Sequence, residues 1–188
     1  MKQALLISIR FTLVTTLLLG IAYPLAVTAF AHLAFRNKAD GQLISHNGQI
    51  LGSRIIGQSF TSDKYFHSRP SAAGNGYDAT SSGGSNFAAS NQKLITRIQG
   101  DVAKYQQEAP GQLVPIDLVT ASGSGLDPDI TPAAALFQVH HVAEVRKLPE
   151  SEVRNLVAEH TQARQFGVLG EPRVNVLELN LALDDLQK

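Results

Sequence analysis

The residues with the clearest potential for chemistry lie in one short stretch, VTASGSGLDPDITPAAA, residues 119–135. Its two Ser-Gly pairs could form a concave nest of backbone N–H groups for an anion, because glycine reaches left-handed conformations. An aspartate follows the second pair and would repel phosphate unless a cation intervened. One interpretation of the stretch is therefore a nucleotide or partner loop made of Ser122, Gly123, Ser124, Gly125 and Asp127.

The second interpretation of this stretch is a helix start. Thr131 can accept a hydrogen bond from a free backbone N–H, and Pro132 suits the first helical position, where no N–H is needed. Asp127 and Asp129 would then lie near the positive end of the helix dipole. The stretch lacks the G-x-x-x-x-G-K-[ST] phosphate loop and the spacing of a twelve-residue calcium loop. Both interpretations stay open at this point.

A possible serine nucleophile lies upstream, where residues 90–93 read Ser-Asn-Gln-Lys and match S-x-x-K. This motif carries the nucleophile of penicillin-binding proteins, which are often membrane-anchored. The S-D-N and K-T-G signatures of that class are missing, as is G-x-S-x-G. A membrane-anchored serine enzyme is therefore retained only as an alternative.

The composition excludes several further kinds of chemistry. The chain has 188 residues and equal totals of basic and acidic residues, 16 of each, so no basic field favours nucleic acid. It contains no cysteine, which excludes disulfides, thiol nucleophiles and thiolate metal sites. The histidines lack H-x-x-x-H and H-E-x-x-H spacing, and we expect no metal site. They are His32, His46, His67, His140, His141 and His160.

An apolar segment precedes all these residues. Residues 11–35 contain no Asp, Glu, Lys or Arg and would span about 37 Å as a helix at about 1.5 Å per residue. Pro24 is tolerable there with a kink, and the threonine hydroxyls can bond back to the helix. Gly20 and Ala22 provide small-residue surface for packing against another membrane helix.

A cleaved signal peptide is the alternative to a retained anchor. Lys2 and Arg10 form a positive start, and Ala-Phe-Ala at residues 29–31 resembles a cleavage site. The apolar run continues past the proline for longer than a signal core needs, which favours an anchor. Basic residues lie on both sides of the span, since Arg36 and Lys38 follow it, so charge does not give the orientation.

We predict three parts: a short tail at residues 1–10, a transmembrane helix at 11–35, and a soluble domain at 36–188. The domain interleaves strand and helix patterns, which indicates an α/β or α+β fold. The Gly- and Ser-rich residues 64–86 predict a long surface loop. The predicted strands are residues 50–60, 113–120 and 173–179. The predicted helices are residues 94–105 after a cap at Ser85-Asn86, 136–143 after Thr131, and 153–160 after Pro149.

Several segments together carry a family resemblance: FTLVTTLLLGIAYPL, GSRIIGQSF, YFHSRPSA, YDATSSGGSN, DLVTASGSGLDPDITPAAA and LGEPRVNVLELNLAL. In this order and spacing they resemble the C subunit of the Kdp potassium-transporting ATPase. The resemblance implies a single-span protein of the bacterial cytoplasmic (inner) membrane whose soluble domain lies outside the cytoplasm. It also implies three partners, namely a channel-like potassium-binding subunit, a P-type ATPase subunit and a small membrane subunit.

The resemblance implies an accessory role in assembly and, as a catalytic chaperone, in raising the ATP affinity of the ATPase subunit. The chain agrees by lacking the D-K-T-G phosphorylation motif and the T-V-G-Y-G filter. ATP could be bound in a ternary complex, with residues 122–125 or 81–86 as contacts, and no cofactor is bound tightly. An extracytoplasmic domain would instead dock near the potassium entrance and affect ATP through coupling. An anchored extracytoplasmic binding module is a further alternative.

Overall fold

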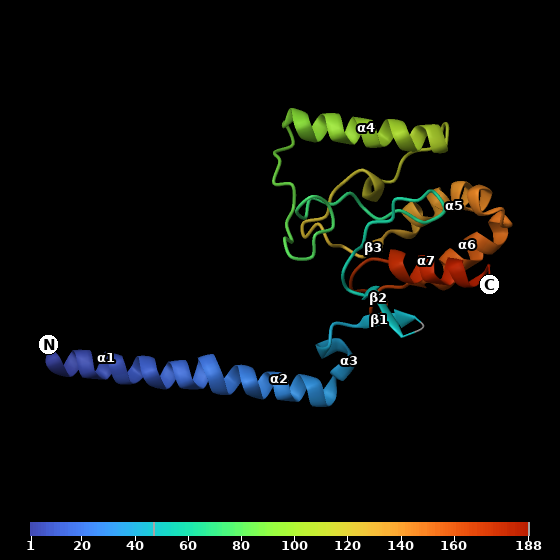
Figure 1. Ribbon diagram of the computed structural model, residues 1–188. Helices are drawn as coiled ribbons and strands as arrows, with labels where there is room; N and C mark the ends of the chain where they lie inside the picture. The colour runs from blue at the N-terminus through green and yellow to red at the C-terminus, as the bar shows by residue number, and fades with distance from the viewer. Residues whose placement is uncertain (47, 188) are drawn as a thin grey trace. The chain divides into compact units, whose positions relative to one another are not determined.

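The computed structural model describes residues 1–46 and 48–187, and the chain divides into two compact units, Met1–Leu51 and Gly52–Lys188. The first unit is drawn mainly in blue in Figure 1. It begins with one continuous helix composed of α1 (Lys2–Thr15), a π-helical segment η1 (Thr16–Ala22) and α2 (Tyr23–Ala34). Among the described residues this is the one helix long and apolar enough to cross a membrane.

The π-helical segment lies directly before α2, whose second residue is Pro24. A proline ring in a helix removes one N–H donor and crowds the preceding turn, and a wider turn accommodates both effects. The hydroxyl of Thr15 donates to the carbonyl of Phe11 at 2.8 Å. For this residue, the predicted hydrogen bond from a threonine hydroxyl to the helix backbone is confirmed. The unit continues with α3 (Arg36–Ala39) and β1 (Leu43–His46), and β1 pairs with β2 (Gln49–Ser53), whose last two residues follow the end of this unit at Leu51.

The second unit is an α+β domain with one hydrophobic core. Its small sheet has the order β3-β5-β4, and both strand pairs are antiparallel. This antiparallel pairing decides between the two predicted fold classes in favour of α+β. The strands are β3 (Asp129–Ile130), β4 (Thr161–Gln162) and β5 (Arg173–Asn175). The helices are α4 (Gln92–Glu108), α5 (Pro132–Arg146), α6 (Glu150–Glu159) and α7 (Val176–Asp185).

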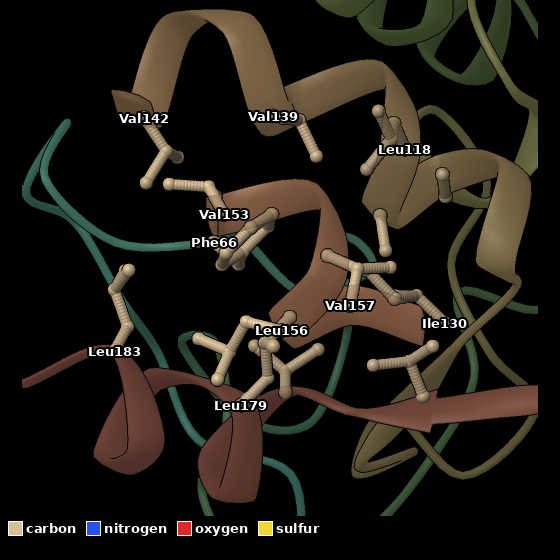
Figure 2. Packing of buried hydrophobic residues seen from close by; sticks show 14 of the residues in the cluster. Phe66, Leu118, Ile130, Val139, Val142, Val153, Leu156, Val157, Leu179 and Leu183 are labelled. Atoms are coloured by element: carbon tan, nitrogen blue, oxygen red, sulfur yellow. The ribbon is translucent and has the colours of Figure 1, made fainter. Parts of the chain in front are cut away.

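The core lies where α5, α6 and α7 pack together, as Figure 2 shows. Val139 and Val142 come from α5, and Val153 and Val157 from α6, all of them almost completely buried. Such a core is the main source of stability, at roughly 1.5–3 kcal/mol for each fully buried large aliphatic side chain. The core therefore fixes the loops that connect these helices.

The three predicted helices form, with one wrong cap. α5 begins as predicted, because the Thr131 hydroxyl accepts the N–H of Ala134 at 3.2 Å and Pro132 is its first residue. α6 begins at Glu150 directly after a proline, also as predicted. α4 is capped by Asn91, whose side chain accepts the N–H of Lys93 at 2.9 Å, and not by Ser85-Asn86.

The predicted strands are largely wrong. In the range 50–60 the strand β2 ends at Ser53, and residues 113–120 contain a 3-10 turn, η2 (Ile116–Leu118), in place of a strand. In the range 173–179 the strand ends at Asn175, whose side chain accepts the N–H of Glu178 at 3.1 Å and starts α7. A local cap here prevails over the β-branched composition that suggested a longer strand.

Residues 64–86 are irregular, as predicted, but they are not confined to the surface. Phe66 and Ala73 are completely buried, and Figure 2 shows Phe66 within the core cluster. The buried amide of Asn180 accepts the N–H of Phe66 at 2.8 Å and donates to its carbonyl at 3.0 Å. Gln138 binds the backbone of His67 in the same way, at 2.7 and 3.1 Å. Two side-chain amides thus replace a neighbouring strand for this segment.

The buried guanidinium of Arg146, at the end of α5, binds two segments that are distant in sequence. It donates to the carbonyl of Lys64 at 2.6 Å, to the carboxylate of Asp184 at 2.7 Å and to the side chain of Gln187 at 3.0 Å. It also lies 4.9 Å from the centre of the Tyr65 ring. A buried charge is costly unless hydrogen bonds and an opposite charge compensate it. For Arg146 these partners come from both ends of the domain.

Candidate functional site

The Ser-Gly loop, defined as residues 122–125, packs against residues 71–84 of the long irregular segment. The carbonyl of Ser124 accepts the N–H of Gly83 at 2.8 Å, and the carbonyl of Gly125 accepts the hydroxyl of Ser71 at 2.6 Å. Ser122 and Gly125 are buried, while the two residues between them are exposed. The loop therefore uses its backbone to hold another loop of the same domain.

Two N–H groups at the C-terminal end of the Ser-Gly loop are engaged by acceptors within the loop. Gly125 donates to the carbonyl of Ser122 at 3.3 Å, and Leu126 donates to the hydroxyl of Ser124 at 3.1 Å. Gly125 has φ +68°, and a Cβ there would lie 2.6 Å from backbone atoms of Ala73 and Gly83. The glycine is thus required by a close approach of two backbones, a structural reason for the motif.

Asp127 also has a structural partner. Its carboxylate lies 3.0 Å from the Arg69 guanidinium, which in turn donates to the carbonyl of Thr120 at 3.3 Å. The other carboxylate oxygen accepts the N–H of Asp129 at 3.1 Å. The structure thus holds the predicted site residues, Ser122 to Gly125 and Asp127, against one irregular segment, residues 64–86.

A charged cleft of about 240 Å³ lies beside Asp127. Asp129 in this cleft pairs with Arg173 at 3.0 Å and with the Asn175 amide at 3.2 Å, yet burial raises the pKa of its carboxyl. Asp117, which the sequence did not single out, accepts the N–H of Thr131 at 2.7 Å. Within the described part of the chain, no group of three His, Cys, Asp or Glu side chains could hold a metal ion.

A second cleft, of about 360 Å³, lies between α4 and the irregular segment. His67 lies on its wall, and its Nε2 is buried without a hydrogen-bond partner among the described residues. Burial and the nearby Lys104 ammonium lower the pKa of His67, so its imidazole is neutral at pH 7. The residues that line this cleft are Ser59, Phe60, Thr61, His67, Ser68, Arg69, Pro70, Tyr77, Asp101, Lys104, Tyr105 and Leu118.

The residues of the S-x-x-K motif lie apart from His140 and His160. Ser90 precedes α4 and Lys93 lies in its first turn, and both residues are exposed. His140 pairs with Glu150 on the surface at 3.3 Å. The ring of His160 lies 2.9 Å from the carbonyl of Leu156, at the end of α6. These groups do not converge on one site.

The structure adds one surface feature that sequence reasoning missed. We call residues 165–170, Gln-Phe-Gly-Val-Leu-Gly, the apolar turn. Gln165 and Leu169 exchange two backbone hydrogen bonds of 2.9 Å, which close the turn. Phe166 is 91% exposed, Val168 72% and Leu169 56%. Two glycines bracketing apolar residues were the available signal, because that pattern indicates a turn and not a core strand.

Together these observations define a class: a small α+β domain that follows a helix able, by length and composition, to cross a membrane. The family description "K+-transporting ATPase, c chain" matches residues 5–185, so the chain belongs to this family. The predicted family resemblance is confirmed. The chain is therefore an accessory subunit of a potassium-transporting ATPase, and the catalytic ATPase is a different subunit.

Individual relatives agree with this assignment over their whole length. The chain is 58% identical over 187 residues to the "Potassium-transporting ATPase KdpC subunit" of Koribacter versatilis, covering 100% of this chain and 97% of the relative. Proteins of the same name from Acidobacterium capsulatum and Rhodopseudomonas palustris are 55% and 53% identical, over 95% and 94% of this chain and 96% and 95% of theirs. These similarities do not support the serine-enzyme or free binding-module alternatives.

Proposed function

We propose that the chain is a single-span subunit of the bacterial inner membrane that holds a potassium-importing ATPase complex together from outside the cytoplasm. The observation that carries the proposal is the family match over residues 5–185, which includes both the spanning-length helix and the α+β domain. The relatives are named as subunits of a potassium-transporting ATPase, and a subunit requires partner chains. The expected partners are the potassium-binding, ATPase and small membrane subunits.

The anchor is the helix from Lys2 to Ala34, with the soluble domain following from residue 36. None of the helix residues is buried, so its apolar side chains are available to lipid or to partner helices. Its 33 residues exceed the roughly 20 needed to cross a bilayer, which leaves room for tilt.

The membrane orientation can be tested with thiol labelling because the chain has no cysteine of its own. Leu113→Cys places a label on a domain residue that is 95% exposed, and Lys2→Cys places one at the other end of the span. In cells stripped of the outer wall, a membrane-impermeant maleimide should label position 113 at once and position 2 only after lysis. The reverse pattern would place the domain in the cytoplasm.

Assembly can be tested by extracting the tagged full chain in mild detergent. The expected result is recovery of the chain with the larger subunits of the complex. Recovery of the chain alone, from cells in which the other subunits are present in the membrane, would overturn the subunit proposal.

We further propose that any effect on ATP affinity is transmitted through the complex and involves no nucleotide contact at the Ser-Gly loop. The engaged N–H groups of Gly125 and Leu126 support this, because they are directed to acceptors inside the loop. Ser124→Ala should therefore leave the KM of the assembled complex for ATP unchanged within about twofold. A tenfold rise in KM with unchanged complex recovery would restore direct contact.

A further inference from the structure

The apolar turn combines two unfavourable features at one residue. Phe166 adopts φ +53°, a left-handed conformation that is a clear outlier for a bulky side chain. The same side chain is 91% exposed to water. Strained residues persist where the surrounding structure enforces them, and they gather at binding and functional sites.

Two other left-handed residues of the domain have local explanations. Tyr77 is partly buried, and its hydroxyl donates to the carbonyl of Arg69. Lys147 ends α5, and its N–H and that of Leu148 bond back to carbonyls of the last turn, as at many helix ends. Phe166 differs from these two residues because it combines the left-handed backbone with a large apolar side chain that is 91% exposed.

The turn is also held in one conformation before any contact with a partner. The two Gln165–Leu169 bonds are joined by donation from Gly167 to the carbonyl of Arg164 at 3.1 Å. Arg164 and Glu171 form an ion pair of 2.5 Å that closes the base of the turn. A rigid apolar projection loses little conformational entropy on binding, and such aromatic anchors dominate interface energies.

We propose that the apolar turn is an anchor that inserts Phe166 into an apolar recess of a partner subunit in the ATPase complex. The proposal rests on the subunit role described above. Charge favours a protein over a lipid surface: residues 165–170 carry no charge, and the flanking Arg164 is neutralised by Glu171. Peripheral membrane contacts commonly add free basic residues to attract anionic lipid.

The test uses the tagged full chain expressed with the other subunits. Phe166→Asn removes the aromatic ring and places a residue that tolerates the left-handed conformation, so folding is preserved. The matched control is Leu113→Asn, which removes a side chain of similar size and exposure elsewhere on the domain. We expect Phe166→Asn to weaken retention of the partner subunits about tenfold and the control to leave it unchanged.

The outcomes separate the two proposals. If the unmodified chain retains its partners and Phe166→Asn retains them equally, the apolar turn is not an anchor, while the subunit role stands. An equal loss in both variants would also overturn the anchor, because the effect would not be specific to the turn. If the unmodified chain retains no partner, the subunit role itself fails.

A cross-link identifies what the turn contacts. Phe166→Cys carrying a benzophenone maleimide keeps an aromatic group at this position, and the cysteine-free chain in the same complex is the control. The expected product on illumination joins the tagged chain to a larger subunit. A lipid adduct or a product of two copies of this chain would overturn the proposal.

Discussion

The Ser-Gly loop and the apolar turn are both short, glycine-containing connections, but they use their groups in opposite ways. The Ser-Gly loop has the composition of a ligand site, and the structure commits its backbone to residues 71–84. The apolar turn contains apolar side chains of the kind that usually enter a core, and the structure exposes them. The comparison shows that polar, flexible residues do not mark an open site when a neighbouring loop satisfies them, whereas exposed apolar residues remain available.

The largest expected effect distinguishes one left-handed glycine of the Ser-Gly loop, Gly125, from one of the apolar turn, Gly167. Gly125→Ala should lower the free energy of unfolding by about 2–5 kcal/mol, because strain adds to contact with the backbone of Ala73 and Gly83. Gly167→Ala, with φ +76° and open space around it, should cost only about 1–2 kcal/mol. Urea unfolding of the full chain in mild detergent measures both, and equal losses would show that the Ser-Gly loop is not tightly packed.

A smaller loss of stability is expected when the ion pair beside the Ser-Gly loop or beside the apolar turn is removed. Arg69→Met should cost about 1–3 kcal/mol, because it leaves the half-buried carboxylate of Asp127 without its cation. Arg164→Met is the matched change at the apolar turn, where the more exposed pair should contribute less than about 1 kcal/mol. The same unfolding measurement applies. A larger loss for Arg164 would reverse the assignment of which region is structural.

The third expected effect is small and of opposite sign. Phe166→Asn should leave the unfolding free energy unchanged or raise it by less than about 1 kcal/mol, because strain is relieved and almost no buried area is lost. Thermal unfolding monitored by circular dichroism is sufficient to detect the sign. A loss above about 1 kcal/mol would mean that the ring packs within its own domain.

The last expected effect is a pH dependence of stability caused by His67, which lies in the irregular segment, residues 64–86, that packs against the Ser-Gly loop. Because the pKa of His67 is lowered in the folded state, the unfolded chain binds more protons near pH 6. The stability that the domain gains from keeping His67 neutral is therefore fully present above about pH 6.5. It is lost as the pH falls through that value towards the pKa of His67 in the folded state. His67→Gln should show a weaker pH dependence of the urea midpoint between about pH 8 and 5.5 than the unmodified chain, and an unchanged pH dependence would contradict this contribution.

The sequence predicted the helices well because their signals are local. Thr131 with Pro132 marked the start of α5, and the residue after Pro149 began α6, since caps and prolines act on their own backbone. The spanning-length helix was equally clear from its uninterrupted apolar run. The mixed α and β character followed from the same patterns.

The strands and the site could not be predicted in this way because non-local contacts decide them. Phe66 became part of the core through the amide of Asn180, a partner 114 residues away. Residues 113–120 looked like a strand, but Asp117 within this range lies in a 3-10 turn and accepts the N–H of Thr131. The Ser-Gly loop looked like a ligand site because nothing in its own composition reveals that Ser71 and Gly83 satisfy its carbonyls.

The amide of Asn180 that holds the Phe66 backbone also sets when the domain can finish folding during synthesis. At roughly 5–20 residues per second, a ribosome needs roughly 6–23 s to make the 114 residues that separate the two partners. The hydrogen bonds of Arg146 to Asp184 and Gln187 likewise form only after residues almost at the end of the chain have been synthesised. These contacts therefore cannot be completed until the last helix, α7, and the residues after it have been synthesised.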